Sequence, residues 1–469
     1  MAAPDEVIRD DDPQAAPTGL AAFGYHQELR RSLGLVDLVI YGLLFISPTA
    51  PFPTFGIVFN DSHGLVPLVY AVGLAAMLFT ALSYMAMAHE FPVSGSVYAY
   101  AGRGIGEGAG FLAGWAMLLD YALIPAGIYI ICAVALNVVL PGVPKALWVV
   151  ALLALNTVIN LAGIETAARM NWALLTLQLL LLGAFFVLGA IALAHGAGGA
   201  HLSARPLWSA GVSPALIFSA MPVAALSFLG FDAVSTLSEE ARGGPRAVGA
   251  ATMLALVVAA VLFIAQTWLG SLFVLDVSRF APGKPTDTAF YEVVKLVGGE
   301  PFKWVVSIFG VLFGGVSAAL VSQAGASRLI YSMARDRRLP SALAKVHPAR
   351  QVPVRAILLV AAVTLVLGVS FVDQLELILT VVSIGALTGF MLLHASVISH
   401  FFLRKRTGDW RRHLLVPLLG LAIIAYVLVS AKANAKIVGA SWMGLGAAVM
   451  LALRATGRLR PLGAGSAAP

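Results

Sequence analysis

Charged residues are scarce in this 469-residue chain: they make up 11% of it, whereas a soluble domain carries about 25%. Hydrophobic residues make up 59%. So little charge cannot cover a water-exposed surface of this size, which excludes a soluble enzyme of two or three domains. The sequence therefore predicts an integral membrane protein with the lipid bilayer as its solvent.

Cysteine is nearly absent. The single Cys132 lies in an apolar stretch, cannot form an intramolecular disulfide and is expected to be a small buried side chain. The sequence also lacks metal-site spacings, a Walker A motif and HExxH, so we expect no metal, no cofactor and no enzymatic activity. The first 30 residues are polar and acidic without an apolar core, and we therefore expect no signal peptide.

Long apolar runs, by contrast, recur along the whole chain, and a membrane helix requires roughly 20 apolar residues. They predict an all-α membrane protein with 12 transmembrane helices. The approximate limits are 35–59, 65–88, 107–139, 146–164, 171–194, 214–240, 248–274, 302–333, 354–371, 375–401, 413–430 and 437–455.

The positive charges predict an orientation. If the N-terminus is inside, 22 of the 30 Lys and Arg residues fall in cytoplasmic segments. Such an excess follows the positive-inside rule and places both termini in the cytoplasm, for a multi-pass protein of the plasma (inner) membrane. The excess of Lys and Arg over Asp and Glu thus reflects the membrane topology, and no nucleic-acid partner is expected. No oligomeric state follows from the sequence.

Two predicted spans carry helix-breaking residues near mid-membrane. The first contains Pro48, Pro51 and Pro53, each of which removes a backbone donor and clashes with the preceding turn. The sixth contains Gly230, followed by Phe231 and Asp232. Irregular backbone at this depth persists only where it is buried in protein or lines a wet cavity. We therefore expect both helices to be interrupted and to share a pocket.

Each interrupted helix opens a block of five spans, so the two blocks have opposite orientations. We expect a cytoplasmic tail over 1–32, a first repeat over 33–195, an inverted second repeat over 213–401, two extra helices over 402–456 and a cytoplasmic tail over 457–469. Interrupted helices at matching positions of inverted halves indicate the substrate site of a secondary transporter.

The candidate substrate-binding residues lie at the interruptions and in the third span. The prolines leave few free N–H donors in the first turn, so its carbonyl oxygens favour a cationic amine. The aromatic residues of this set, Phe228 and Phe231, are expected to form a gate or an amine cage, or to pack in the protein core. Asp120 and Tyr121 are expected to bind an amine or carry a proton, or to make a structural hydrogen bond. Asp232 either caps the second half-helix or binds a cation. The full set is Ser47, Thr49, Ala50, Asp120, Tyr121, Phe228, Gly230, Phe231 and Asp232.

Four further polar residues are candidates for gating or proton coupling. Glu239 and Glu240 end the sixth span and are either solvated end charges, or one of them closes an inner gate or carries a proton. Arg328 either snorkels to the interface or closes a gate. Gln178 stands alone among leucines, where a helix–helix hydrogen bond is the simplest role.

Four segments of the chain resemble the amino acid–polyamine–organocation (APC) superfamily, which has the LeuT-type fold of a 5+5 inverted repeat. They are FPVSGSVYAYA (91–101), GWAMLLDY (114–121), SFLGFDAVSTLSEEARGGPRAVGAA (227–251) and SRLIYSMARDRRLPSALAKVHP (327–348). Within the superfamily the sequence is most similar to bacterial putrescine importers. The resemblance implies uptake driven by the proton-motive force, with substrate between spans 1, 3, 6, 8 and 10. It also implies diamine recognition by Asp120, Tyr121, Asp232 and Glu239 or Glu240.

The sequence thus predicts a secondary transporter that imports a small organic amine such as putrescine, with a proton as coupling ion, by alternating access. An amino acid permease for neutral or cationic substrates is the alternative on the same fold. A channel or receptor-like membrane protein is less favoured, because the spans are apolar apart from the few sites named above.

Overall fold

The computed structural model describes residues 28–140, 142–209, 212–281, 284–373, 375–430 and 433–457. Over these residues the chain is a helical bundle without a strand, and an isolated bridge joins Leu33 to Ala241. The prediction of an all-α protein is confirmed. Most of the two expected tails, 1–27 and 458–469, lies outside the described residues.

Fifteen α-helices, joined by short 3₁₀ and π segments, make up the described part of the chain. They are α1 (Leu35–Ile46), α2 (Pro51–Ser62), α3 (Val66–Glu90), α4 (Val97–Gly104), α5 (Glu107–Val139), α6 (Lys145–Ala162), α7 (Ile164–Ala194), α8 (Pro214–Leu226), α9 (Gly244–Ser271), α10 (Lys284–Asp287), α11 (Ala289–Arg335), α12 (Val354–Ser370), α13 (Leu375–Val397), α14 (Val416–Ser430) and α15 (Ala433–Ala455). The 3₁₀ segments are η2 (Ala197–Gly199), η3 (Phe231–Leu237) and η4 (Ser341–Ala344), and the π segments are η5 (Ile398–Arg404) and η6 (Arg411–Leu415).

Nine helices of the described chain are long and apolar enough to cross a membrane, and two bent pairs raise the number to 11 if each pair is one span. The bent pairs are α1 with α2, at 55°, and α8 with η3, at 44° between Pro214–Met221 and Val223–Leu237. These are the two spans that the sequence predicts to be interrupted, and that prediction is confirmed. The apolar α12, with 17 residues, is shorter than the nine.

Several helices differ from the predicted limits by a few residues, α7 begins at Ile164 rather than near 171, and two elements differ further. The helix α11 begins at Ala289 rather than near 302, because a further stretch of helix precedes a break at Gly299, where φ is 76°, and Pro301 follows that break. The helix α4 has eight residues and is too short to be predicted from apolar runs of membrane length. In contrast, α5 covers the predicted range 107–139.

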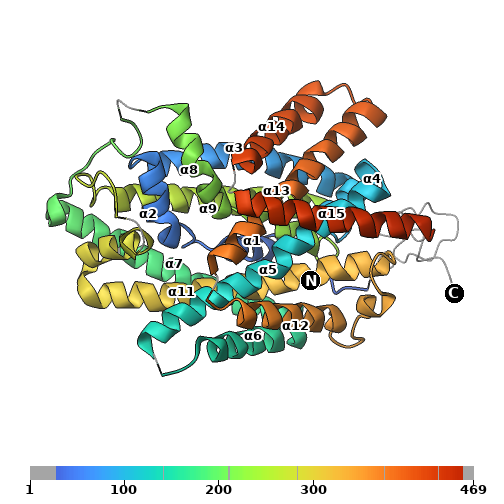
Figure 1. Ribbon diagram of the computed structural model, residues 1–469, viewed down its shortest axis with the longest axis horizontal. Helices are drawn as coiled ribbons and strands as arrows, with labels where there is room; N and C mark the ends of the chain where they lie inside the picture. Colours follow the sequence, from blue (N-terminus) through green and yellow to red (C-terminus); the bar gives the residue numbers. More distant parts are fainter. Residues whose placement is uncertain are drawn as a thin grey trace, which may run out of the picture.

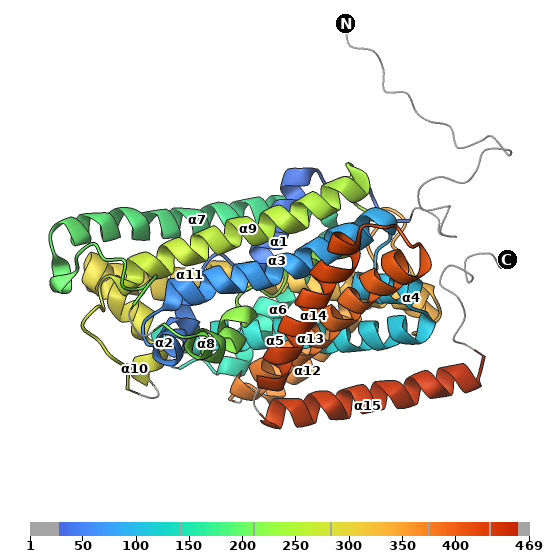
Figure 2. The same cartoon turned by 90° about the horizontal axis from the view of Figure 1, so that it is seen from above.

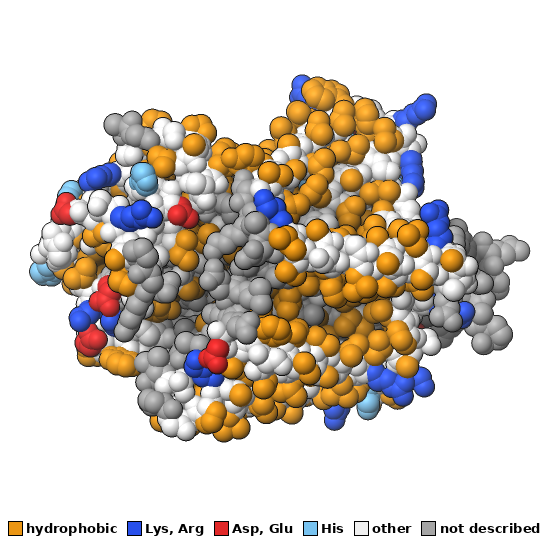
Figure 3. Space-filling view, viewed as in Figure 1, with side chains coloured by type: hydrophobic (Ala, Val, Ile, Leu, Met, Phe, Trp, Pro, Cys, Tyr) orange, Lys and Arg blue, Asp and Glu red, His pale blue; other side chains and the backbone are white. Residues whose placement is uncertain are grey.

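The long helices run along one axis of the molecule, with α1 near its centre and α2 and α8 toward one end (Figure 1). The helix α5 packs against α11 and α13, and α3 packs along α9. Figure 2 places α15 at the outer edge of the bundle. Apolar side chains cover α12, α14 and α15, while charged side chains gather toward the two ends of the long axis (Figure 3). This pattern suits helices that cross a bilayer along that axis.

Candidate functional site

The first interruption spans four residues between α1 and α2. Ser47 has φ 65°, an unusual value for a residue other than glycine, and ends α1. The carbonyl of Pro48 accepts a hydrogen bond from Nε2 of Gln266 on α9, at 2.9 Å. The amide of Ala50 donates to the carbonyl of Ser47 at 3.0 Å, which closes a tight turn. The prolines therefore break the helix as predicted, and a neighbouring helix binds one of the freed carbonyls.

The second interruption lies between α8 and η3. Gly230 has φ 112°, and a Cβ at this position would overlap the ring of Phe45 on α1. Glycine is thus required both by the backbone conformation and by the close approach of the two interrupted spans. The structure brings the two breaks together, as the sequence predicts.

A cavity of about 260 Å³ lies against both interruptions, α5 and α11. Ser47, Thr49 and Ala50 line it, as expected for substrate-binding residues, and Ser227 adds a hydroxyl. Most of the remaining wall is apolar or glycine. Among the described residues that line the cavity, none is charged. The other lining residues include Phe45, Phe52, Ile124, Ile128, Leu229, Gly310, Gly314 and Gly315.

The predicted acids lie outside this lining, in the protein interior. Asp232 is 1% exposed, and its Oδ2 accepts hydrogen bonds from the hydroxyls of Tyr121, at 2.5 Å, and Tyr84, at 3.4 Å. Asp120 is also 1% exposed, and its Oδ1 has no hydrogen-bond partner among the described residues. It lies one helical turn before Ile124, which lines the cavity. Asp120 directly precedes Tyr121, whose hydroxyl binds Asp232, and the two acids are called the acid pair below.

Phe45 lies between the cavity and Tyr121, the hydrogen-bond partner of Asp232. Its side chain lines the cavity, and its ring centroid lies 5.8 Å from that of Tyr121. The route from the cavity to Asp232 thus passes from Phe45 to the ring of Tyr121 and then to its hydroxyl. The N-cap interpretation of Asp232 is wrong, because Gly230 is the cap residue of η3 and Asp232 lies in its first turn.

Phe228 and Phe231 are fully buried behind the second interruption. Phe228 packs against Tyr70 and Phe263, with centroid distances of 5.9 and 5.3 Å. Phe231 packs against Tyr84 and Phe390, at 5.9 and 5.8 Å. Neither residue lines the cavity, so the packing interpretation fits them better than an amine cage.

Gln178 connects α7 to the first interruption. Its Nε2 donates to Oγ of Ser317 at 2.9 Å, and its Oε1 accepts from Oγ of Ser47 at 3.4 Å. The hydroxyl of Ser47 also lies 3.3 Å from that of Thr49. Gln178 therefore makes the helix–helix hydrogen bond that the sequence favours, and the bond reaches two residues of the cavity wall.

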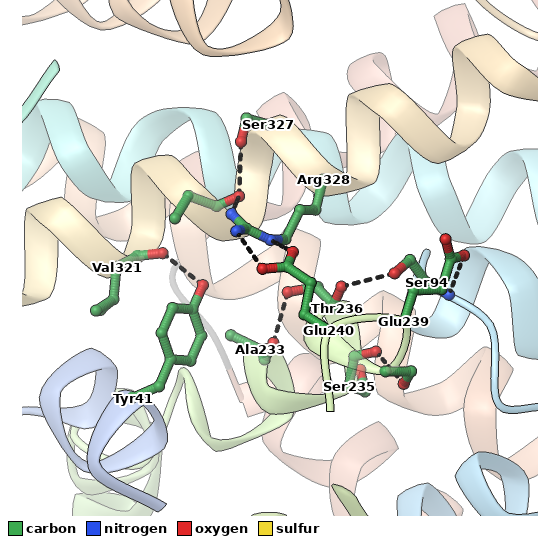
Figure 4. Close-up of polar contacts among 12 residues, drawn as sticks. Tyr41, Ser94, Ala233, Ser235, Thr236, Glu239, Glu240, Val321, Ser327 and Arg328 are labelled. Carbon is green, nitrogen blue, oxygen red and sulfur yellow. Dashed lines mark hydrogen bonds and ion pairs between the residues drawn. The ribbon is translucent and has the colours of Figure 1, made fainter. Parts of the chain in front are cut away.

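Two largely buried ion pairs lie just beyond η3, and Figure 4 shows the one between Glu240 and Arg328. Glu240 accepts from Nε and Nη2 of Arg328 at 2.5 and 2.9 Å, and the two side chains are 1% and 4% exposed. Glu239 accepts from Arg335 at 2.8 and 3.0 Å and from the amide of Ser94 at 2.9 Å. The interpretations of these acids as solvated end charges and of Arg328 as a snorkelling residue are therefore wrong.

Arg335 is a member of this cluster that the sequence analysis missed. A signal for it exists: Arg328 and Arg335 are seven residues apart, so they lie on one face of α11, two turns from each other. Two consecutive acids end the sixth span, and two arginines on one helix face match them in number.

Comparison with known proteins agrees with this architecture. A family model described as "Amino acid permease" matches residues 38–442. The low-affinity putrescine importer PlaP of Escherichia coli is 32% identical over 425 residues, which cover 89% of this chain and 92% of PlaP. The branched-chain amino acid permease BcaP of Bacillus subtilis is 29% identical, covering 86% and 88%. The methylthioribose transporter of Bacillus subtilis is 26% identical, covering 90% and 92%.

The matched region includes both interruptions, the acid pair and the buried ion pairs. All of these relatives are transporters by name, and the family is one of transport proteins rather than enzymes. The chain therefore belongs to the amino acid permease family of the APC superfamily.

Proposed function

We propose that this permease imports a small organic amine such as putrescine, together with a proton, by alternating access. The observation that carries the proposal is the position of the acid pair behind the cavity. Phe45 and Tyr121 connect the cavity wall to Asp232. Asp120 lies one helical turn before Ile124, which lines the cavity. Carboxylates at this depth are costly and mark substrate or proton pathways.

The cavity suits the two parts of such an amine. Putrescine has a short apolar chain between two ammonium groups, and Ile124, Ile128 and Phe52 offer apolar surface for the chain. The hydroxyls of Ser47 and Thr49 can accept hydrogen bonds from one ammonium. We infer that the second ammonium reaches the acids only when Phe45 moves, which would couple binding to a conformational change.

In this proposal the cluster of Glu239, Glu240, Arg328 and Arg335 holds the cytoplasmic end closed. Both pairs are bidentate and join the end of η3 to α11; the Glu240–Arg328 pair is buried, and in the other pair the side chain of Arg335 is 11% exposed. Asp120 is the proposed proton carrier, since its Oδ1 lacks a described hydrogen-bond partner. Gln178 is the proposed link between α7 and the first interruption.

The proposed architecture is the LeuT-type arrangement with 12 spans. The repeats cover 33–195 and 213–401, two extra helices cover 402–456, and the tails 1–32 and 457–469 are cytoplasmic. The interruption of the first span of each repeat supports this arrangement. The proposed location is the plasma (inner) membrane of a bacterium.

A neutral amino acid is the second candidate substrate, and one observation favours it. The described lining of the cavity carries no charge, and BcaP transports branched-chain amino acids according to its name. A channel is less favoured, because the buried ion pairs close one end of the site.

Uptake by proteoliposomes tests the proposal. We expect saturable accumulation of radiolabelled putrescine when the outside is acidic, and a loss of accumulation when an ionophore collapses the proton gradient. Unlabelled diamines should compete, whereas leucine should not. Competition by leucine but by no diamine would overturn the amine proposal in favour of the amino acid, and non-saturable flux would indicate a channel.

A further inference from the structure

A second cavity, of about 590 Å³, lies away from the substrate site, among α3, α9 and the start of α14. Figure 2 shows α3 lying between α9 and α14, and α3 packs against both. Part of the lining is apolar: Leu82, Met85 and Ala86 come from α3, Ala250 from α9 and Val416 from α14. Such a surface accommodates a hydrocarbon chain.

The remaining lining of this cavity is basic. Arg246 and His89 are exposed, and Arg246 forms no ion pair with any residue that the structure describes. Arg412 and His413 also line the cavity, and the guanidinium of Arg412 lies 3.6 Å from the carboxylate of Asp409, a long contact.

The acid in the lining does not cancel this charge. Glu90 is already paired with Lys405, whose Nζ lies 2.5 Å from its Oε1. The adjoining segment 404–412 has five Lys or Arg residues and one acid, Asp409. The unsatisfied charge at the cavity is therefore positive.

The cavity lies at the level where several spans end. The helix α3 ends at Glu90, α9 begins at Gly244, and α14 begins at Val416. Trp410 in the adjoining segment is 52% exposed, and tryptophan is enriched at the level of lipid headgroups. Basic pockets between helices at this level bind anionic lipid headgroups.

We propose that this cavity binds an anionic phospholipid. Its phosphate lies between Arg246 and Arg412, and an acyl chain lies along Leu82, Met85 and Ala250. The apolar part of the lining favours a lipid over a free phosphate ion, which has no apolar group to bury there. The basic part favours an anionic lipid over a zwitterionic one, because the choline of phosphatidylcholine cancels the charge of its phosphate.

Native mass spectrometry of the full-length protein tests the proposal. We expect the wild-type protein to retain phosphatidylglycerol in preference to phosphatidylcholine. Each of Arg246→Gln and Arg412→Gln should weaken phosphatidylglycerol binding about fivefold, since a basic residue near the lipid surface contributes about 1 kcal/mol. Ala250→Phe fills the apolar part without changing the charge and should also reduce binding.

Arg454→Gln is the matched control, because Arg454 is an exposed arginine in the last turn of α15 and does not line the cavity. Equal retention of both lipids by the wild-type protein would overturn the proposal without any variant, so misfolding cannot obscure the result. If Arg454→Gln lost the lipid to the same extent, the binding would depend on general surface charge and the proposed site would be wrong. Displacement of the lipid by millimolar inorganic phosphate would assign the site to a free anion.

Discussion

At the scale of single residues, Phe45 and Gly230 determine how the two interrupted spans meet. The ring of Phe45 lies where a Cβ on residue 230 would stand, and its other side faces the ring of Tyr121. Because residue 230 has no side chain, the ring of Phe45 can lie between the cavity and Tyr121, the partner of Asp232. A side-chain atom added at position 230 would displace the ring of Phe45.

Replacing Gly230 tests this arrangement. Gly230→Ala forces a side chain into a backbone with φ 112° and into the ring of Phe45. The backbone conformation alone costs about 1–3 kcal/mol, so we expect a lower melting temperature in detergent and a loss of uptake. Gly183→Ala on α7 is the control, because a Cβ there meets open space; it should leave both unchanged. Unaltered uptake by Gly230→Ala would show that the close approach is not needed.

Asp120 is tested by removing its charge without changing its size. We expect Asp120→Asn to lower kcat/KM for putrescine about 10- to 100-fold, since a hydrogen bond to a charged group contributes about 1.5–3 kcal/mol. The pH dependence of uptake should also flatten if Asp120 carries the proton. Asp276→Asn, at an exposed position, is the control. Unchanged kinetics and pH dependence in Asp120→Asn would remove Asp120 from the mechanism.

At the scale of elements, η3 and α11 are joined by charge rather than by apolar packing alone. The 3₁₀ segment ends at Leu237, and the acids that follow it reach the arginines of α11. The hydroxyl of Ser94 donates to the carbonyl of Thr236 at 3.0 Å and ties the turn before α4 to the same segment (Figure 4). The end of η3 is therefore held from two sides.

Breaking one partner of a buried pair is expected to be costly. Glu240→Gln leaves Arg328 charged and 4% exposed, which should destabilise the protein by about 3–5 kcal/mol. Replacing both residues, as Glu240→Gln with Arg328→Met, should recover part of this loss because no buried charge remains. Glu292→Gln is the control: it breaks an exposed pair with Lys303 and should cost less than about 1 kcal/mol. Thermal unfolding that ranks these variants otherwise would contradict the expected energetics.

The elements also show what could be predicted from the sequence. Both interruptions were predictable, since Pro48, Pro51 and Gly230 act on the local backbone. The acid pair was predicted as a site, but not its separation from the cavity, because that depends on Phe45, a residue from another span. Local hydropathy did not identify the partners of Glu239 and Glu240, because it does not distinguish a solvated carboxylate from one that meets an arginine on a distant helix; the seven-residue spacing of Arg328 and Arg335 is the signal that could have done so.

At the scale of the whole molecule, one end of the bundle is closed by contacts between distant segments. Leu33 pairs with Ala241 through backbone bonds, which attach the segment before α1 to the end of the sixth span. Tyr331 donates to Glu28 at 3.0 Å. In the proposed alternating-access mechanism these contacts separate when this end opens, and they stay closed when the cavity opens toward the other end.

The final prediction concerns this closure, which is measured with a single reporter thiol. Ser332→Cys in a Cys132→Ser background places the thiol on α11 between Arg328 and Arg335, where Ser332 is 1% exposed. In Arg335→Gln, Glu239 loses its guanidinium partner, and the closed state loses about 3 kcal/mol, a shift of about a hundredfold toward opening. A membrane-impermeant maleimide applied to the proposed cytoplasmic side should therefore label the reporter thiol much faster than in the parent. Lys303→Gln, which removes an exposed pair with Glu292, should not change the rate. If the rate in Arg335→Gln equals that of the parent, the ion pair does not keep this end closed.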